Sequence, residues 1–238
     1  MTLHGGERRC NSFSPAARGQ RRRTQQGIGD KMAAVIDPSA QVLPGVEFAG
    51  DVIVEAFCVL GALPGNLKPG DRPTVIGAGA HIRSHSVIYC GTIIGDRFQT
   101  GNGVNIREDN RIGHDVSIGT HSVLEHSIEI DDGVRIHSNV FIPECTRIGR
   151  AAWIGPNVVL TNAKFPAERE TKFHLIGPQI AEGARVGANS TVLPGVKLGQ
   201  NCLIGAGAVV TRDVPAGMLA VGNPARIVRP VGRSNYQA

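Results

Sequence analysis

The strongest constraint on this chain is an aliphatic residue that returns at every sixth position over most of its length. A period of six matches neither the 3.6-residue turn of an α-helix nor the simple alternation of an open strand. It is typical of a solenoid, in which short strands stack on copies of themselves. Thr100 is the only polar residue at this leading position. The series comprises Ile36, Val42, Phe48, Val54, Leu60, Ile76, Ile82, Ile88, Ile94, Thr100, Ile106, Ile112, Ile118, Leu124, Ile130, Ile136, Ile142, Ile148, Ile154, Leu160, Ile180, Val186, Val192, Leu198, Ile204 and Val210.

Two other positions of the hexad support the same fold. The second is often glycine, as at Gly77 and Gly95, which tolerates the backbone angles and close approach of a tight corner. The fifth is mostly small or β-branched, as at Ala80 and Val104, and suits a second inward-pointing side chain. One large and one smaller apolar residue per hexad predict a solid prism rather than a pore.

The pattern resembles that of the hexapeptide-repeat acyltransferase family, whose repeat begins with an aliphatic residue often followed by glycine. The resemblance covers roughly residues 36–228. It implies an all-β fold, a left-handed parallel β-helix with three hexads in each triangular coil. The left hand comes from the resemblance, because the usual crossover preference is right-handed. The family is usually homotrimeric, with active sites between neighbouring prisms, so the resemblance also implies self-association.

The ends and interruptions of the hexads predict the domain organisation. We expect a disordered basic extension over 1–31, a β-helix over 32–230 and a short tail over 231–238. The formal charge of +5 is concentrated in the extension, which carries seven basic and two acidic residues. The folded body is therefore close to neutral, and we expect no nucleic-acid partner. Residues 66–75 and 166–179 interrupt the hexads as loop excursions, and the second is expected to cover part of a site.

The five cysteines lack CxxC spacing. Cys58 and Cys202 fall at the fifth hexad position, where a small buried side chain is wanted. This favours reduced thiols and a cytoplasmic protein. The sequence contains neither an apolar core for a secretory signal nor a stretch long enough to span a bilayer, so no membrane partner is expected.

Stacking predicts which polar residues meet, because residues 18 apart lie one above the other. One such column contains Glu108, His126, Glu144 and Asn162. Carboxylates above and below His126 would raise its pKa and make it a better proton acceptor. Either glutamate could also orient the ring. The column thus suits a general base that takes a proton from an attacking amine or hydroxyl.

The string Val123-Leu124-Glu125-His126 resembles a stretch of bacterial sugar-nucleotide N-acetyltransferases in which the histidine is the proposed base. An acidic residue follows that histidine in the family, whereas Ser127 follows here. The assisting role would then pass to Glu144 or Glu108.

A second column includes His121 and Asn139. The run Ile136-His137-Ser138-Asn139-Val140 and the later Leu160-Thr161-Asn162 resemble a different branch, which acts on 3-amino sugar nucleotides. There an asparagine matching Asn139 contacts the substrate near its amine, and positioning replaces base catalysis. We expect His126, Glu144 and Glu108 to be catalytic, and Asn139, Asn162 and His121 to contact substrate.

The segment Val186 to Arg229 resembles the acyl-CoA site of the family. The resemblance implies that Ala188 and Ala206, 18 residues apart, let the pantetheine arm lie against the prism. Arg212 and Arg226 would meet the nucleotide phosphates, for which forked guanidinium donors are suited.

The sequence therefore predicts an acetyl-CoA-dependent N-acetyltransferase that acts on a nucleotide-linked amino sugar without a metal. Sugar O-acetylation is the main alternative. A carbonic-anhydrase-like metalloenzyme and a non-catalytic scaffold remain further alternatives, although the histidine spacing of the former is not reproduced.

Overall fold

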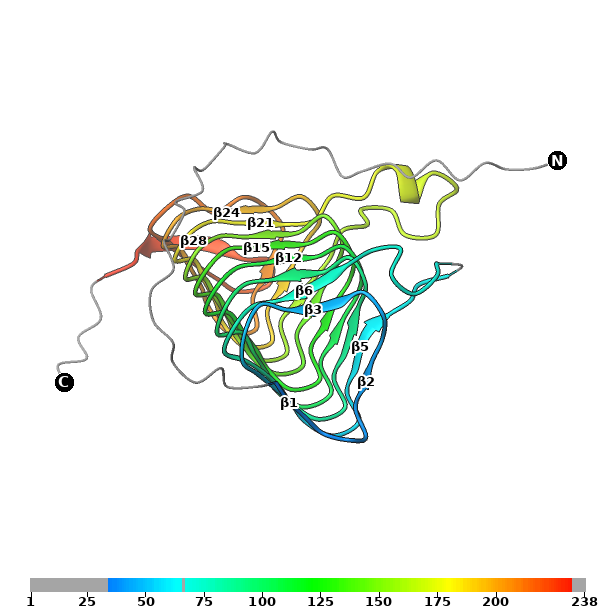
Figure 1. Ribbon diagram of the computed structural model, residues 1–238. Helices are drawn as coiled ribbons and strands as arrows, with labels where there is room; N and C mark the ends of the chain where they lie inside the picture. The colour runs from blue at the N-terminus through cyan, green and yellow to red at the C-terminus, as the bar shows by residue number, and fades with distance from the viewer. Residues whose placement is uncertain (1–33, 66, 233–238) are drawn as a thin grey trace, which may run out of the picture. The chain divides into compact units, whose positions relative to one another are not determined.

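The computed structural model describes residues 34–65 and 67–232 of the 238-residue chain. The expected extension 1–31 and most of the expected tail lie outside these residues. The described part is a left-handed parallel β-helix, as predicted, and its three faces outline a triangle when seen along the stacking axis (Figure 1). We call the faces A, B and C in the order in which the chain visits them.

Face A is an eleven-stranded sheet that is parallel except for its last strand. Its strands are β1 (Val35–Ile36), β4 (Val52–Val54), β7 (Ala80–Ile82), β10 (Gln99–Thr100), β13 (Ser117–Ile118), β16 (Arg135–Ile136), β19 (Trp153–Ile154), β22 (Arg185–Val186), β25 (Leu203–Ile204), β27 (Met218–Val221) and β28 (Arg226–Pro230).

Faces B and C are parallel sheets of nine and eight strands. Face B holds β2 (Gln41–Val42), β5 (Val59–Ala62), β8 (Val87–Tyr89), β11 (Asn105–Ile106), β14 (Val123–Leu124), β17 (Phe141–Ile142), β20 (Val159–Leu160), β23 (Thr191–Val192) and β26 (Val209–Val210). Face C holds β3 (Val46–Phe48), β6 (Thr74–Ile76), β9 (Ile93–Ile94), β12 (Arg111–Ile112), β15 (Glu129–Ile130), β18 (Arg147–Ile148), β21 (Gln179–Ile180) and β24 (Lys197–Leu198).

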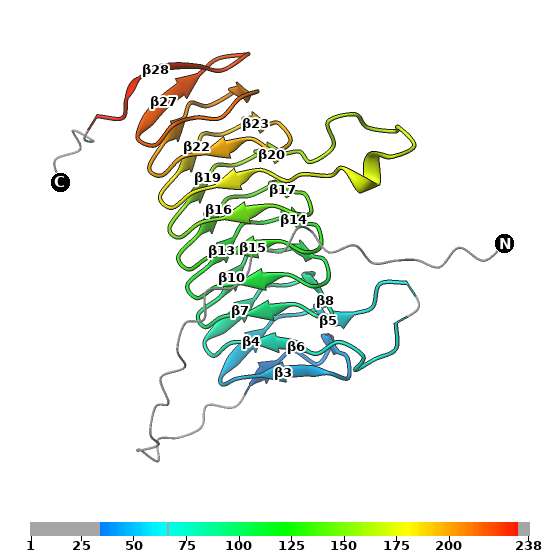
Figure 2. The same cartoon turned by 90° about the horizontal axis from the view of Figure 1, so that it is seen from above.

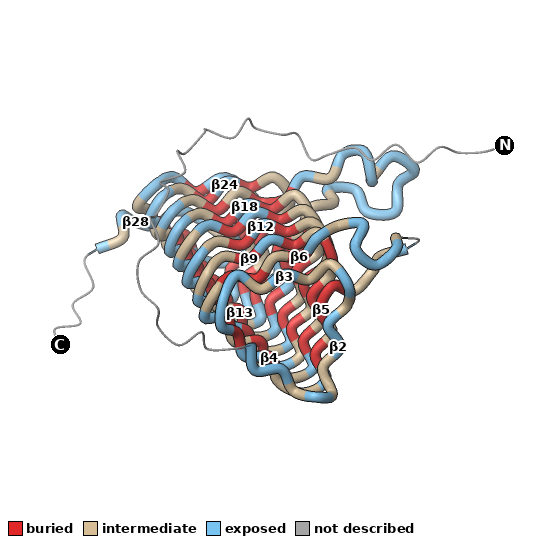
Figure 3. The backbone as a smooth tube through the Cα atoms, viewed as in Figure 1, coloured by how far each residue is buried: buried red, intermediate tan, exposed pale blue. Residues whose placement is uncertain are grey.

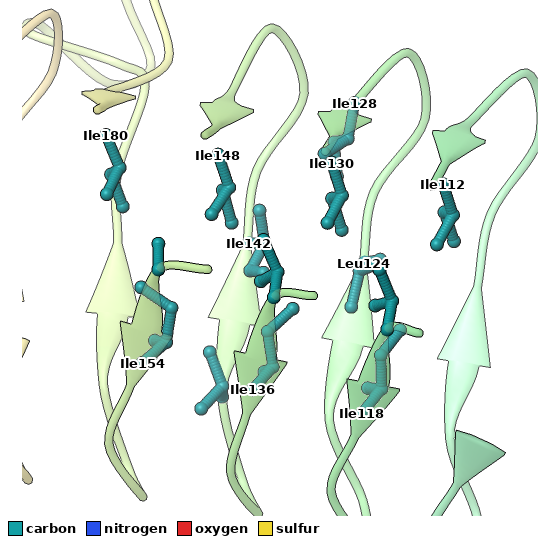
Figure 4. Close-up of a cluster of buried hydrophobic side chains, with 14 of the residues drawn as sticks. Ile112, Ile118, Leu124, Ile128, Ile130, Ile136, Ile142, Ile148, Ile154 and Ile180 are labelled. Carbon is teal, nitrogen blue, oxygen red and sulfur yellow. The ribbon is translucent and has the colours of Figure 1, made fainter. Parts of the chain in front are cut away.

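The predicted 18-residue register is confirmed wherever the hexads are uninterrupted. Ile106 aligns with Leu124, and Leu124 with Ile142, on successive strands of face B. The leading residues form vertical aliphatic ladders inside the prism (Figure 4). The buried backbone positions line up as red stripes that cross successive coils (Figure 3).

The first coil departs from this rule. Ile36 and Val42 occupy leading positions, yet each is 37% exposed, because no further coil of the described chain lies beneath them. Thr100 is buried and accepts a hydrogen bond from the Arg83 amide at 2.8 Å. A polar residue is therefore accommodated in the ladder, since its hydroxyl is paired.

The corners explain the choice of residues between strands. Asn139 and Asn157 adopt left-handed backbone angles, with φ near 58° and 57°, which asparagine tolerates better than most residues. A Cβ added to Gly95 would lie 2.7 Å from the carbonyl carbon of Gly113 in the next coil, so this position has no room for a side chain.

Both excursions leave the prism at the corner between faces B and C, at different heights (Figure 2). The first spans 63–73, and the second spans 161–178 and contains the 3-10 helix η1 (Thr171–Phe173). Their predicted ends were too late, because Thr74 and Gln179 already belong to β6 and β21. The two excursions thus flank one stretch of a single corner.

Candidate functional site

The predicted acid–base column lies at the corner between faces B and C, between the two excursions. Glu108, His126 and Glu144 are each the second residue after a face B strand, namely β11, β14 and β17. Because these strands are in register, the three side chains leave the prism one above the other.

His126 and Glu144 are in direct contact. The imidazole Nε2 lies 2.7 Å from Glu144 Oε2, and both side chains are partly buried. When the ring is neutral, this contact places its proton on Nε2 and leaves the lone pair on Nδ1. The Oγ atom of Ser127 lies 3.3 Å from Nδ1. The site therefore presents a single imidazole nitrogen that can accept a proton.

The contact also changes the acidity of both groups. The hydrogen bond to Glu144 raises the pKa of His126, against an opposing effect of burial. The same hydrogen bond lowers the pKa of Glu144. Glu144 therefore stays ionised beside a histidine that has become a stronger base.

Glu108 occupies the column but has a different partner. Its carboxylate accepts hydrogen bonds from Arg107 Nη2 at 2.8 Å and Nε at 3.0 Å. Of the two glutamates that the sequence offers to orient His126, Glu144 is the one hydrogen-bonded to the ring. Glu108 acts on it through its charge.

Asn110 is a site residue that the sequence analysis missed. Its side chain is completely buried and makes three hydrogen bonds to the corner backbone. Its Nδ2 donates to Arg107 O at 2.7 Å and Glu125 O at 2.9 Å, and its Oδ1 accepts from the Ile128 amide at 2.7 Å. Asn110 thus holds both sides of the turn that carries His126. The sequence did contain a signal for Asn110, because it is a polar residue at the fifth hexad position, which is usually apolar.

Asn162 is the second residue of the second excursion, and its carbonyl accepts a hydrogen bond from the Ile176 amide at 3.0 Å. The excursion encloses a mainly apolar pocket of about 420 Å³. Charge from Lys172, in the same excursion, helps to lower the pKa of Glu144. The excursion therefore lies close to the column. The pocket is lined by Lys164, Phe165, Glu168, Glu170, Thr171, His174, Ile176 and Pro194.

His121 and Asn139 lie elsewhere, at the corner between faces A and B. The structure therefore does not bring them to His126 within one chain. Both have left-handed backbone angles, with φ of 57° and 58°, and both are exposed. Corner geometry accounts for the asparagine, and its role in substrate contact stays a prediction.

The proposed acyl-CoA residues are divided between corners. Ala188 and Ala206 stack at the corner between faces A and B, because β22 and β25 are in register. A Cβ added to the neighbouring Gly207 would meet no atom within 4 Å, so this corner has open space beside it. Arg226 begins β28, at the edge of face A, whereas Arg212 follows β26 at the corner between faces B and C. The two arginines thus lie in different parts of the fold, and their contact with the nucleotide phosphates stays a prediction.

No cluster of three histidine, cysteine or acidic side chains within 34–65 and 67–232 could hold a metal ion. Cys58, Cys90 and Cys202 are buried free thiols, as expected, whereas Cys145 is disulfide-bonded, contrary to the expectation of reduced thiols. None of the helices in the described ranges is long and apolar enough to cross a membrane.

Comparison with known proteins identifies the repeats. Residues 177–212 match the model of the bacterial transferase hexapeptide, and residues 110–143 match the hexapeptide repeat of succinyl-transferase. Galactoside O-acetyltransferase of Lactococcus lactis is 35% identical over 88 residues, which are 34% of this chain and 42% of that protein. The first curated relatives, from Staphylococcus aureus, are matched over 32% of their length, so the chain spans about a third of them.

Two solved structures share the architecture. The polySia specific acetyltransferase NeuO aligns with a TM-score of 0.52 and 20% identity, over 84% of this chain and 92% of that one. The Arabidopsis UDP-N-acetylglucosamine acyltransferase aligns with a TM-score of 0.50 and 20% identity, over 83% and 74%. At this identity the likeness shows the fold alone.

Proposed function

Because this chain belongs to the hexapeptide-repeat proteins, we propose that it is an acetyl-CoA-dependent acetyltransferase with His126 as its general base. The observation that carries the proposal is the 2.7 Å contact between His126 Nε2 and Glu144 Oε2. It supplies a partly buried, oriented imidazole at a corner flanked by two excursions. Such a group suits the removal of a proton from an attacking nucleophile.

The reaction is a direct transfer. The acceptor nitrogen attacks the thioester carbonyl carbon while Nδ1 of His126 takes a proton from that nitrogen. The tetrahedral intermediate then collapses, the carbon–sulfur bond breaks, and the imidazolium returns the proton to the departing thiolate of CoA. Glu144 stabilises the imidazolium in between, because opposite charge favours the protonated ring.

We infer that the acceptor is the amine of a nucleotide-linked amino sugar. The support is the resemblance of Val123–His126 to the sugar-nucleotide N-acetyltransferases. O-acetylation of a sugar is the second candidate, because a neutral hydroxyl depends more on a base than an amine does. The charge-assisted histidine and the similarity to a galactoside O-acetyltransferase both favour this alternative.

The acetyl donor would lie along the corner of Ala188 and Ala206, where small side chains leave room for a pantetheine arm. That corner and the His126 corner border the same face B. The outer side of face B carries exposed apolar side chains, with Phe141 and Val159 in register and 36% and 39% exposed. These exposed apolar side chains, which other copies of the chain would bury, support the proposed homotrimer, and the site would then lie between prisms.

The test is release of free CoA from acetyl-CoA, measured with a panel of amino-sugar nucleotides and plain sugars. The His126→Ala variant should lose roughly a hundredfold or more in kcat. Asn139→Ala should lose far less if base catalysis dominates. Full activity of His126→Ala, together with collapse of Asn139→Ala, would refute the base and support catalysis by positioning. No turnover and no CoA binding by the wild-type protein would instead support a scaffold.

The proposed use of acetyl-CoA supports a cytoplasmic location, as do the free thiols of Cys58, Cys90 and Cys202, whereas the disulfide at Cys145 argues against it.

A further inference from the structure

Arg107 is the centre of the charged cluster beneath His126. Its guanidinium is bidentate on Glu108, through Nη2 at 2.8 Å and Nε at 3.0 Å. Its Nη1 lies 3.4 Å from Glu125 Oε2. The ring of Tyr89 packs beneath it, with the guanidinium carbon 5.8 Å from the ring centroid. Four contacts thus fix a single side chain against the corner.

Glu108 is the more buried of the two glutamates that flank His126. Its side chain is only 12% exposed, compared with 22% for Glu144. An ionised carboxylate in such a place needs a partner, because its hydration has been lost. Arg107 supplies two hydrogen bonds and the opposite charge, so the Glu108 carboxylate has a partner other than the histidine.

We propose that Arg107 is a positioning residue that neutralises Glu108, so that Glu144 alone pairs with His126 in the reaction proposed above. Two carboxylates flank one imidazole in the column, and they differ because only Glu108 is paired with the guanidinium. Glu144 orients the ring, whereas Glu108 anchors Arg107 at the corner. The assignment depends on geometry that the 18-residue register alone does not provide.

The chemical reason is that a general base must be unprotonated to work. Glu144 and Glu108 both favour the protonated ring, and the charge of Arg107 opposes them by lowering the pKa of His126. With two uncompensated carboxylates the histidine would hold its proton to higher pH and would be unavailable for catalysis. Arg107 therefore keeps the base unprotonated to lower pH than the two carboxylates alone would allow.

The other charged groups near the column are already accounted for. Glu125 shares Arg107 with Glu108. Asp109, at the same corner, forms an ion pair with Arg72 of the first excursion. Lys172 of the second excursion acts on Glu144. Arg107 remains as the cation whose charge is seen to lower the pKa of His126.

The decisive measurement is an NMR titration of the His126 ring in the full-length protein, assigned by comparison with a His126→Gln spectrum. It needs no activity, so it remains informative if the proposed function is wrong. Arg107→Met should move the midpoint to higher pH, and Glu108→Gln should move it to lower pH. The double variant should return close to the wild-type midpoint, because the two removed charges cancel.

Kinetics give the second readout. The acid limb of the pH profile of kcat/KM should move to higher pH in Arg107→Met. At a pH just below the wild-type midpoint, kcat/KM should fall by roughly three- to tenfold relative to wild type. At alkaline pH the two enzymes should converge. A merely structural defect would lower the rate equally at every pH.

Two control variants complete the design. Arg111→Met removes an exposed arginine from face C, one strand further on, and should leave the titration of His126 unchanged. Arg107→Lys keeps the charge and should stay nearer the wild-type midpoint than Arg107→Met. Unchanged His126 titration in both Arg107→Met and Glu108→Gln would overturn the proposal. A shifted titration with an unshifted pH profile would uphold the electrostatic role and refute His126 as the base.

Discussion

The buried amide of Asn110 yields a prediction that connects stability to the site. Asn110→Ala removes three hydrogen bonds to the backbone around His126. A typical intramolecular hydrogen bond contributes about 1 kcal/mol net, so the free energy of unfolding should fall by about 3 kcal/mol. The groups left behind are backbone N–H and C=O at a buried corner, which makes this loss hard to recover by relaxation.

Urea denaturation followed by circular dichroism measures the effect, with all variants at one protein concentration because association shifts the midpoint. Asn105→Ala is the matched control. Its Oδ1 is buried and has no hydrogen-bond partner among the described residues, so its removal should change stability by less than about 1 kcal/mol. Equal losses in the two variants, or a loss under about 1 kcal/mol for Asn110→Ala, would refute the reasoning.

The same variant should impair catalysis selectively. Once the turn from Glu125 to Ile128 is loosened, His126 is no longer held at a fixed distance from the acceptor. A displacement of about 1 Å can cost on the order of a hundredfold in rate. The KM for acetyl-CoA should change little, because Ala188 and Ala206 lie at another corner.

Three further predictions concern the neighbouring elements. Ala206→Phe should raise the KM for acetyl-CoA at least about tenfold. The loss of stability should be small, because the side chain is exposed. An unchanged KM would show that acetyl-CoA does not bind at this corner. Phe165→Ala should raise the KM for the acceptor by roughly three- to tenfold and leave that for acetyl-CoA unchanged, since the ring lines the pocket of the second excursion. The loss of stability caused by Glu144→Gln should be largest in slightly acidic solution, where Glu144 is ionised and His126 is protonated. That loss should shrink as pH rises through the raised pKa of His126 or falls through the lowered pKa of Glu144. Urea denaturation across the pH range measures it, and a constant difference in midpoint between the wild type and the variant would show that the ion pair is unimportant.

Hexad periodicity predicted the fold because one inward position per strand must be apolar in every coil. That rule alone aligned Ile106 with Leu124 and Ile142, and therefore placed Glu108, His126 and Glu144 in one column. The register holds at Ile36 as well, but its burial does not follow, because no further coil of the described residues lies beneath it.

The contacts within the column could not be predicted in the same way. Register fixes the Cα positions, whereas the pairing of Glu144 with His126 and of Glu108 with Arg107 depends on side-chain rotamers and charge. Asn110 was missed because the hexad rule treats its position as filler for the core. Its amide is instead satisfied by backbone groups of two successive coils.

The position of the second excursion has a consequence for how such a chain can diversify. Ile148 pairs with Ile180, 32 residues on, and yet the strands above and below keep the usual register. Residues inserted at this corner thus leave the prism as a loop and do not disturb the pairing of the strands. Acceptor preference could accordingly be exchanged between related chains by grafting residues 161–178 as a cassette, with the proton-accepting histidine left in place.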